Sequence, residues 1–205
     1  NIERAEIIFG SSSVGYGSDV MGGFIHYYTK KPVLKNSEKI SSSFTTNFNS
    51  ANNSVSNNFN TSLSSDNWGS ITSISISKYG DIKMGKNRNH GFSDWGLNPI
   101  YSKNSRYSYY SDPSINSDNN IQRNTGYSQV DLFQKFLVNL GDSSLLNLNI
   151  QFSESSDIDR FDQLSIPKDN SLKYSEWYYG PQKRLLISPS LRVFPNKKFM
   201  DKGVI

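Results

Sequence analysis

The sequence contains no cysteine, and only two of its 205 residues are histidine. Without thiols the chain forms no disulfide and performs no thiol chemistry, and a structural zinc site is disfavoured because zinc favours cysteine and histidine ligands. Lysine and arginine outnumber aspartate and glutamate by 22 to 18, but Lys30-Lys31 and Lys197-Lys198 are isolated pairs. Clustered basic residues mark nucleic-acid-binding proteins, so no nucleic-acid partner is expected.

Long hydrophobic runs are also missing, and the mean hydropathy is −0.60. A membrane-spanning helix needs about 18 or more consecutive apolar residues, so none is predicted. Strands of a membrane barrel alternate apolar and polar residues and therefore keep the mean hydropathy low. The low value leaves that class of membrane protein open.

An enzyme is not expected, because no nucleophile, base and acid can be assembled around His26 and His90. Gly10 and Gly15 have the spacing of a phosphate-binding loop, but Tyr16 stands where that loop needs lysine. We therefore predict no catalytic residue and no cofactor.

A metal site is not expected either. Asp157, Asp159 and Asp162 form an acidic cluster, but the cluster lacks the glycine and the terminal glutamate of a calcium-binding loop. Arg160 lies inside the cluster and carries the opposite charge.

Two-residue alternation of apolar and polar side chains runs through most of the chain after residue 38, and it predicts β-strands with one apolar and one polar face. Each strand is about ten residues long, which exceeds the usual five to six of globular sheets and suits a tilted membrane strand. The predicted strands are 39–49, 55–63, 70–79, 128–140, 146–153 and 184–194.

The connections after the first hairpin alternate between short and long. They are 66–69, 80–126, 141–143 and 155–182. Outer-membrane barrels have short periplasmic turns and long extracellular loops, so this order predicts the same build and orientation. Aromatic residues near strand ends fit an interfacial girdle. They are Trp68, Tyr79, Tyr127 and Phe194.

The first 32 residues carry the most specific motif. A strand reading IERAEIIFG is followed by YGSDVMGG and by a second strand that ends in TKK. This run resembles the C-terminal end of the plug domain of TonB-dependent outer-membrane receptors, although Val20 stands where that family usually has alanine. The run YYGPQKRLL at 178–186 resembles the barrel of family members grouped with haemoglobin, transferrin and siderophore receptors.

The resemblance implies an all-β fold in which residues 1–32 are the C-terminal part of a plug. Residues 33–205 are then the N-terminal part of an antiparallel transmembrane β-barrel. Six or seven strands do not enclose a plug, because plugged transporters have about 22. We therefore expect an internal fragment of a longer receptor.

The function implied is energised uptake of an iron source, such as a siderophore, haem or an iron-carrying protein, across the outer membrane of a Gram-negative bacterium. The implied partners are the TonB complex, through a segment N-terminal to this chain, and outer-membrane lipid. Two alternatives remain open: a receptor of the same build that imports a glycan, cobalamin or a peptide, and a secreted β-rich adhesin or carbohydrate-binding module.

Candidate ligand-binding residues lie in the segment 80–126, where aromatic faces and cations suit haem, a catecholate or a protein surface. His90 is also a candidate ligand of haem iron. The candidates are Lys86, Arg88, His90, Trp95, Tyr101, Tyr107, Tyr109 and Tyr110.

A second predicted site is the contact between plug and barrel. Glu3, Arg4 and Glu6 are expected to pair with lumen-facing charges of the barrel wall, and the alternative is that Arg4 and Glu6 pair with each other or with water. The wall candidates are Lys135, Arg184 and Arg192. Glycines are expected to supply positive φ or close backbone approach in the plug turn. They are Gly10, Gly15, Gly17, Gly22 and Gly23.

Overall fold

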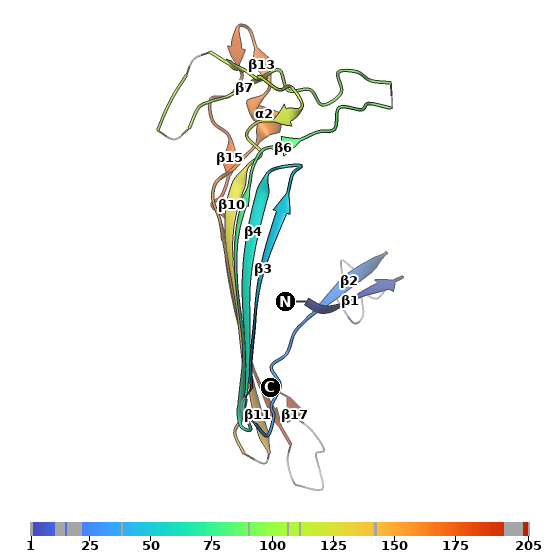
Figure 1. Cartoon of the computed structure of the whole chain (residues 1–205), viewed down its shortest axis with the longest axis vertical. Helices are drawn as coiled ribbons and strands as arrows, with labels where there is room; N and C mark the ends of the chain where they lie inside the picture. Colours follow the sequence, from blue (N-terminus) through green and yellow to red (C-terminus); the bar gives the residue numbers. More distant parts are fainter. Residues whose placement is uncertain are drawn as a thin grey trace.

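Antiparallel strands make up most of the chain in the computed structural model, which confirms the all-β prediction (Figure 1). In the described part of the chain, the α-helix that accompanies the strands is the four-residue α2 (Phe161–Leu164). No helix in that part is long and apolar enough to cross a membrane. The structure describes residues 2–10, 15, 22–37, 39–89, 91–105, 107–110, 112–141, 143–194 and 203–204.

A seven-stranded antiparallel sheet runs along the long axis of the molecule (Figure 1). Its strands follow one another in space as they do in sequence, and six of them are 11 to 13 residues long, as the alternation predicted. No closed barrel is seen in the described residues. The strands are β3 (Lys39–Asn49), β4 (Ser54–Ser64), β5 (Trp68–Tyr79), β10 (Tyr127–Asn139), β11 (Ser144–Ser155), β16 (Lys183–Val193) and β17 (Gly203–Val204).

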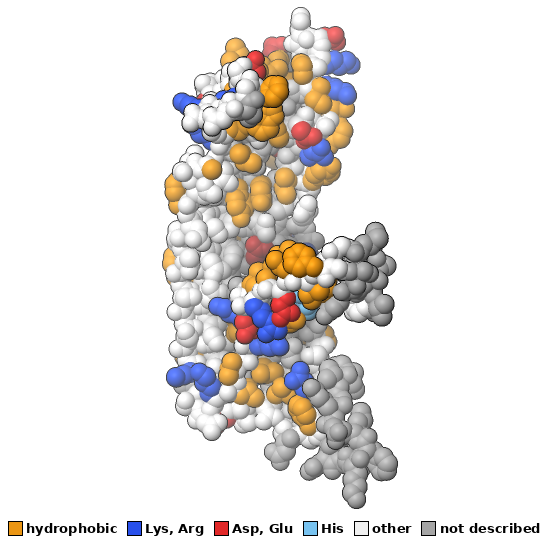
Figure 2. Space-filling view, turned by 90° about the vertical axis from the view of Figure 1, so that its right-hand side faces the viewer, with side chains coloured by type: hydrophobic (Ala, Val, Ile, Leu, Met, Phe, Trp, Pro, Cys, Tyr) orange, Lys and Arg blue, Asp and Glu red, His pale blue; other side chains and the backbone are white. Residues whose placement is uncertain are grey.

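The register confirms the predicted alternation of the two faces. One face, called here the apolar face, carries a row of large hydrophobic side chains across six neighbouring strands. These side chains are Phe44, Phe59, Ile74, Leu132, Phe152 and Leu185. Phe44 is 68% exposed and Leu185 is 63% exposed. The opposite, polar face carries mostly serine, asparagine and glutamine, and it is largely white in Figure 2.

Polar side chains on the apolar face bond to one another across strands. The Thr72 hydroxyl donates to Gln134 Oε1 at 2.6 Å, and Gln134 Nε2 donates to Ser70 Oγ at 2.8 Å. Ser42 and Thr61 share a hydrogen bond between their hydroxyls. These pairs satisfy polar groups that would otherwise interrupt the apolar surface at a cost in free energy.

The long segments gather at one end of the sheet together with the short turn 50–53, and the turns that follow β4 and β10 lie at the other end (Figure 1). The long segments are less irregular than predicted, because short strands pair within them. These are β6 (Ile82–Lys83) with β9 (Ile121–Gln122), β7 (Ile100–Tyr101) with β8 (Ser114–Ile115), β12 (Ile158–Asp159) with β15 (Tyr178–Tyr179), and β13 (Pro167–Lys168) with β14 (Ser171–Leu172).

Two aromatic residues of the predicted girdle face the wrong way for that role. Tyr79 and Tyr127 are opposite each other in the register and stack at 4.6 Å between ring centroids. Both follow the parity of Ser77 and Gln129, so they lie on the polar face. The stacked rings therefore lie at the loop end of the polar face and are not part of the apolar face.

A separate hairpin of β1 (Ile2–Phe9) and β2 (Gly23–Thr29) lies on the polar-face side of the sheet (Figure 1). Gly23 pairs with Phe9 at a φ of +143°, and a Cβ there would meet the Ile8 carbonyl oxygen at 2.6 Å. His26 stacks on Tyr28 with ring centroids 4.2 Å apart. Large apolar side chains on the opposite side of the hairpin are exposed, namely Ile7, Phe9, Ile25 and Tyr27.

Candidate functional site

The connection from the hairpin to β3 crosses the polar face near the turn end of the sheet. Lys135 Nζ donates to Thr29 Oγ1 at 2.6 Å, and the Lys35 N–H donates to the Ser65 carbonyl at 3.0 Å. Pro32 is buried against Gly69, where an added Cβ would meet Pro32 Cβ at 3.2 Å. Because Gly69 has no side chain, the linker lies directly on the sheet.

The charged residues of the hairpin pair with each other, as the alternative hypothesis stated. Arg4 Nε lies 2.9 Å from Glu6 Oε1, and the Arg4 guanidinium lies 4.0 Å from the Tyr28 ring centroid. The Tyr28 hydroxyl donates to Glu6 Oε2 at 3.0 Å. Hydrogen bonding to Tyr28, and then the Glu6 carboxylate, raise the pKa of Arg4. No ion pair among the described residues joins Glu3 or Glu6 to a cation of the sheet.

The structure places the three predicted wall cations on the polar face. Lys135 is 7% exposed and lies within electrostatic reach of Glu3. Arg192 lines the same cavity as Lys135 near the turn end, whereas Arg184 is opposite Ser153 toward the loop end. The hairpin therefore contacts the wall through the hydrogen bond from Lys135 to Thr29, and none of the predicted ion pairs is present among the described residues.

The glycines of the hairpin turn divide into two groups. Gly10 and Gly23 have positive φ, as expected. Gly15 and Gly22 have open space where a Cβ would stand, and their φ angles are ordinary. Gly17 lies outside the described residues.

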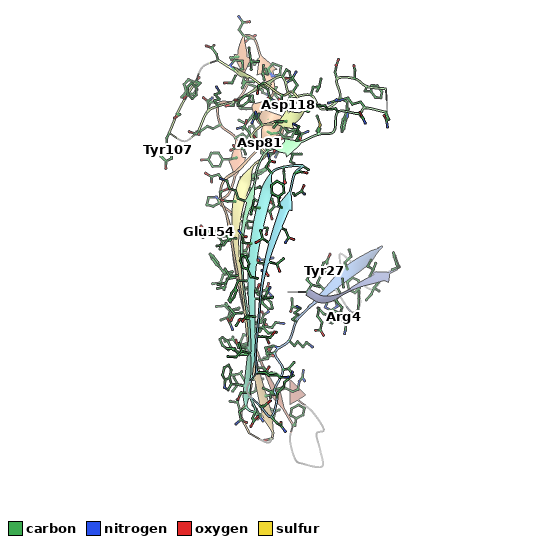
Figure 3. All side chains as sticks on the ribbon, in the orientation of Figure 1. Arg4, Tyr27, Asp81, Tyr107, Asp118 and Glu154 are labelled. Carbon is green, nitrogen blue, oxygen red and sulfur yellow. The ribbon has the colours of Figure 1, made fainter. Side chains whose placement is uncertain are left out.

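The loop candidates do not converge on one place. Arg88 donates to the Trp95 carbonyl at 3.1 Å and to Asn120 Oδ1 at 2.9 Å, so it braces its own loop. The Tyr101 ring lies 5.7 Å from the Arg123 guanidinium carbon. Tyr107 is 90% exposed and projects from the loop end in Figure 3. Lys86 is exposed, and His90 lies outside the described residues.

Tyr109 and Tyr110 do meet residues of the second long segment. They line a cavity of about 190 Å³ together with Lys173 and Tyr174. Ser102 Oγ, which is also in the lining, donates to the Ser175 carbonyl at 3.2 Å and joins the two segments. The remaining lining residues are Asn104, Asp112, Ser171, Leu172 and Ser175.

This cavity is a candidate ligand site at the loop end. Its lining combines tyrosine rings, one ammonium, one carboxylate and several hydroxyl and amide groups, a set that stacks on and hydrogen-bonds to a polar aromatic molecule. Sequence reasoning missed Ser102, Lys173 and Tyr174, because their approach to Tyr109 depends on how two distant loops fold together. The aromatic content of residues 174–179 was the one available signal.

The base of the loops is held by half-buried carboxylates. Asp81 Oδ1 accepts hydrogen bonds from the Thr125 and Gly126 N–H groups at 3.1 and 3.2 Å. Asp118 Oδ2 lies 3.0 Å from Lys83 Nζ. Figure 3 shows Asp81 and Asp118 close above the sheet. The Lys83 ammonium, aided by Asn120, lowers the pKa of Asp118 to about 2.

We expect the loop base to loosen in strong acid. A lowered pKa means that the Asp118 carboxylate stabilises the folded loops above its ordinary pKa of 3.8, and that this contribution is lost as the pH falls to about 2. An NMR titration of the Asp118 carboxyl carbon should give a midpoint near 2. Lys83→Met should raise that midpoint, and a wild-type midpoint at 3.8 would contradict the ion pair.

The acidic cluster is split between two environments. Arg160 binds Asp162 through two hydrogen bonds and holds the pKa of that carboxyl well below its usual range. Burial, followed by the Asp157 charge, raises the pKa of Asp159. The described residues contain no group of three potential ligands that could hold a metal ion.

Comparison with known proteins adds no family assignment. The chain matches no protein-family model, and no curated protein or solved structure matches it.

Proposed function

We propose that this chain is part of a TonB-dependent receptor of the outer membrane that takes up an iron source. The observation that carries the proposal is the sheet itself. Strands of 11 to 13 residues expose rows of phenylalanine, isoleucine and leucine on one face and present serine and asparagine on the other. An exposed apolar surface of this size suits lipid, and a polar face suits a water-filled lumen.

The hairpin supports the plug part of the proposal. It lies on the polar-face side and is attached through Thr29 and the linker, as a plug inside the lumen requires. A two-stranded hairpin is marginally stable alone, and the exposed Ile7, Phe9 and Ile25 suit packing against the rest of a plug. In hydrocarbon the free edge of β3 requires a partner strand, so the proposed receptor includes further strands.

An adhesin or carbohydrate-binding module of the sandwich type would cover the apolar rows with a second sheet. In the described residues no second layer covers Phe44, Phe59 or Leu185. This difference favours the receptor over the module. The tyrosine-lined cavity between the long loops then faces outward and is the proposed first contact with the cargo.

The test is genetic and needs no assumption about the cargo. Deletion of the gene should abolish growth when a siderophore or haem is the sole iron source, and growth with excess free iron should be unaffected. The full-length protein should fractionate with the outer membrane. Normal growth of the deletion strain on each of these iron sources would refute the iron cargo, and recovery of the protein outside the membrane fraction would refute the receptor.

A further inference from the structure

A cavity of about 280 Å³ lies between the linker and the turn end of the polar face. Its floor comes from β10, β11 and β16, where Leu137 is opposite Asn147, and Asn147 is opposite Ser190. Its roof is the linker segment Lys31–Pro32. The cavity lies at the opposite end of the sheet from the tyrosine-lined cavity of the loops.

Three cations line this cavity, and none of its lining residues is acidic. Lys31 comes from the linker, Lys135 from β10 and Arg192 from β16. No described carboxylate lies within ion-pair distance of any of the three. Glu3 acts on Lys135 electrostatically but is not part of the lining.

Lys135 is the central group. The residue as a whole is 7% exposed, and a buried ammonium is costly without a counter-charge. Its hydrogen bond in the described structure goes to the neutral Thr29 hydroxyl. An ammonium has three donors, so two remain to bind an anion. Arg192 adds a planar guanidinium, whose parallel N–H groups can donate to both oxygens of a carboxylate.

The remaining walls indicate what kind of anion fits. Pro32, Leu137 and Leu145 contribute apolar surface, while Asn147 and Ser190 contribute neutral polar groups. Inorganic phosphate would leave the apolar walls without contact. A small organic molecule that carries carboxylates would use both parts of the lining.

We propose that this cavity binds a small organic carboxylate through Lys31, Lys135 and Arg192. The site rests on the geometry of the linker and the sheet and stands independently of the proposed iron cargo. The oxyanion lies between the buried ammonium and the guanidinium, and its carbon skeleton lies against the two leucines and the proline.

Calorimetric titration of the full-length protein with citrate tests the site. Arg192→Gln should weaken citrate binding at least about tenfold, because a hydrogen bond to a charged group is lost. Arg184→Gln is the matched control: it changes the same residue type on the same strand and face, away from the cavity, and should leave affinity within about twofold. Lys135→Gln should also weaken binding. If Lys135→Gln fails to fold, Arg192→Gln decides the test, because Arg192 is exposed and its substitution leaves the interior unchanged.

Two further titrations complete the test. Glycerol, which is uncharged, should not bind, and inorganic phosphate should bind more weakly than citrate. Absence of citrate binding, or an equal loss in Arg184→Gln and Arg192→Gln, overturns the site. Phosphate binding as tight as citrate binding overturns the assignment to an organic carboxylate.

Discussion

In the proposed membrane receptor, Phe44→Arg should destabilise the protein in lipid vesicles by about 2–4 kcal/mol, because the apolar face would then contact lipid and a cation near the middle of the bilayer costs this much. Phe44 lies midway along β3 in the apolar row that continues through Phe59 and Ile74. Its side chain is exposed in the described structure, so the substitution creates no cavity. Apart from the lost cross-strand contact with Phe59, the loss therefore reports whether lipid or water covers that face.

Thr45→Arg is the control for this prediction, because Thr45 is the next residue of the same strand, is also exposed and points to the polar face. In a wet lumen this change should alter the free energy of unfolding by no more than about 0.5 kcal/mol. Urea unfolding of both variants in vesicles gives the comparison. If Thr45→Arg cost as much as Phe44→Arg, the assignment of the two faces would be wrong.

Gly69→Val should release the linker from the sheet. A Cβ at Gly69 would stand 2.9 Å from the Val33 carbonyl oxygen and 3.2 Å from Pro32 Cβ. The first of these neighbours is backbone, so the linker has to move, and overpacking of this kind costs about 1–3 kcal/mol. The Lys35 amide donates to the Ser65 carbonyl, so its hydrogen exchange should become faster when the linker moves. The increase should be at least about fivefold, because a loss of about 1 kcal/mol changes the opening equilibrium by about that factor.

Gly85→Val provides the matched comparison, because Gly85 has ordinary φ and open space where a Cβ would stand. It should leave exchange at Lys35 unchanged. Protection of Lys35 that persists in Gly69→Val would mean that the linker does not lie on the sheet. The same exchange experiment also reports on the roof of the carboxylate cavity, because Pro32 both lines that cavity and lies against Gly69.

The long strands could be predicted from the sequence because period-two alternation is a local property of each strand. The segment 39–49 is predicted to the residue, and 184–194 is shifted by one. The predicted turn 66–69 was too long, because Trp68 already pairs with Val138 at the start of β5. The parity that assigns Ser77 to the polar face also assigns Tyr79 there, so the girdle prediction neglected a signal that was present.

The contacts between distant segments could not be predicted in the same way. The approach of Tyr110 to Tyr174 depends on two loops that fold over each other, and no local pattern encodes it. The carboxylate cavity likewise needs the crossing of the linker over β10, which Gly69 permits. The pairing of Arg4 with Glu6 was accessible, because residues two apart in a strand share a face.

The unpaired edge of β3 has a practical consequence for work with the isolated chain. In the described residues β3 has a neighbour strand on one side only, so alternate residues along its eleven positions direct N–H and C=O groups to the free edge, beside the exposed rings of Phe44 and Phe48. Long, flat, hydrophobic edges template the addition of further strands and lead to aggregation. The 205-residue chain expressed alone should accumulate in inclusion bodies and require refolding in surfactant.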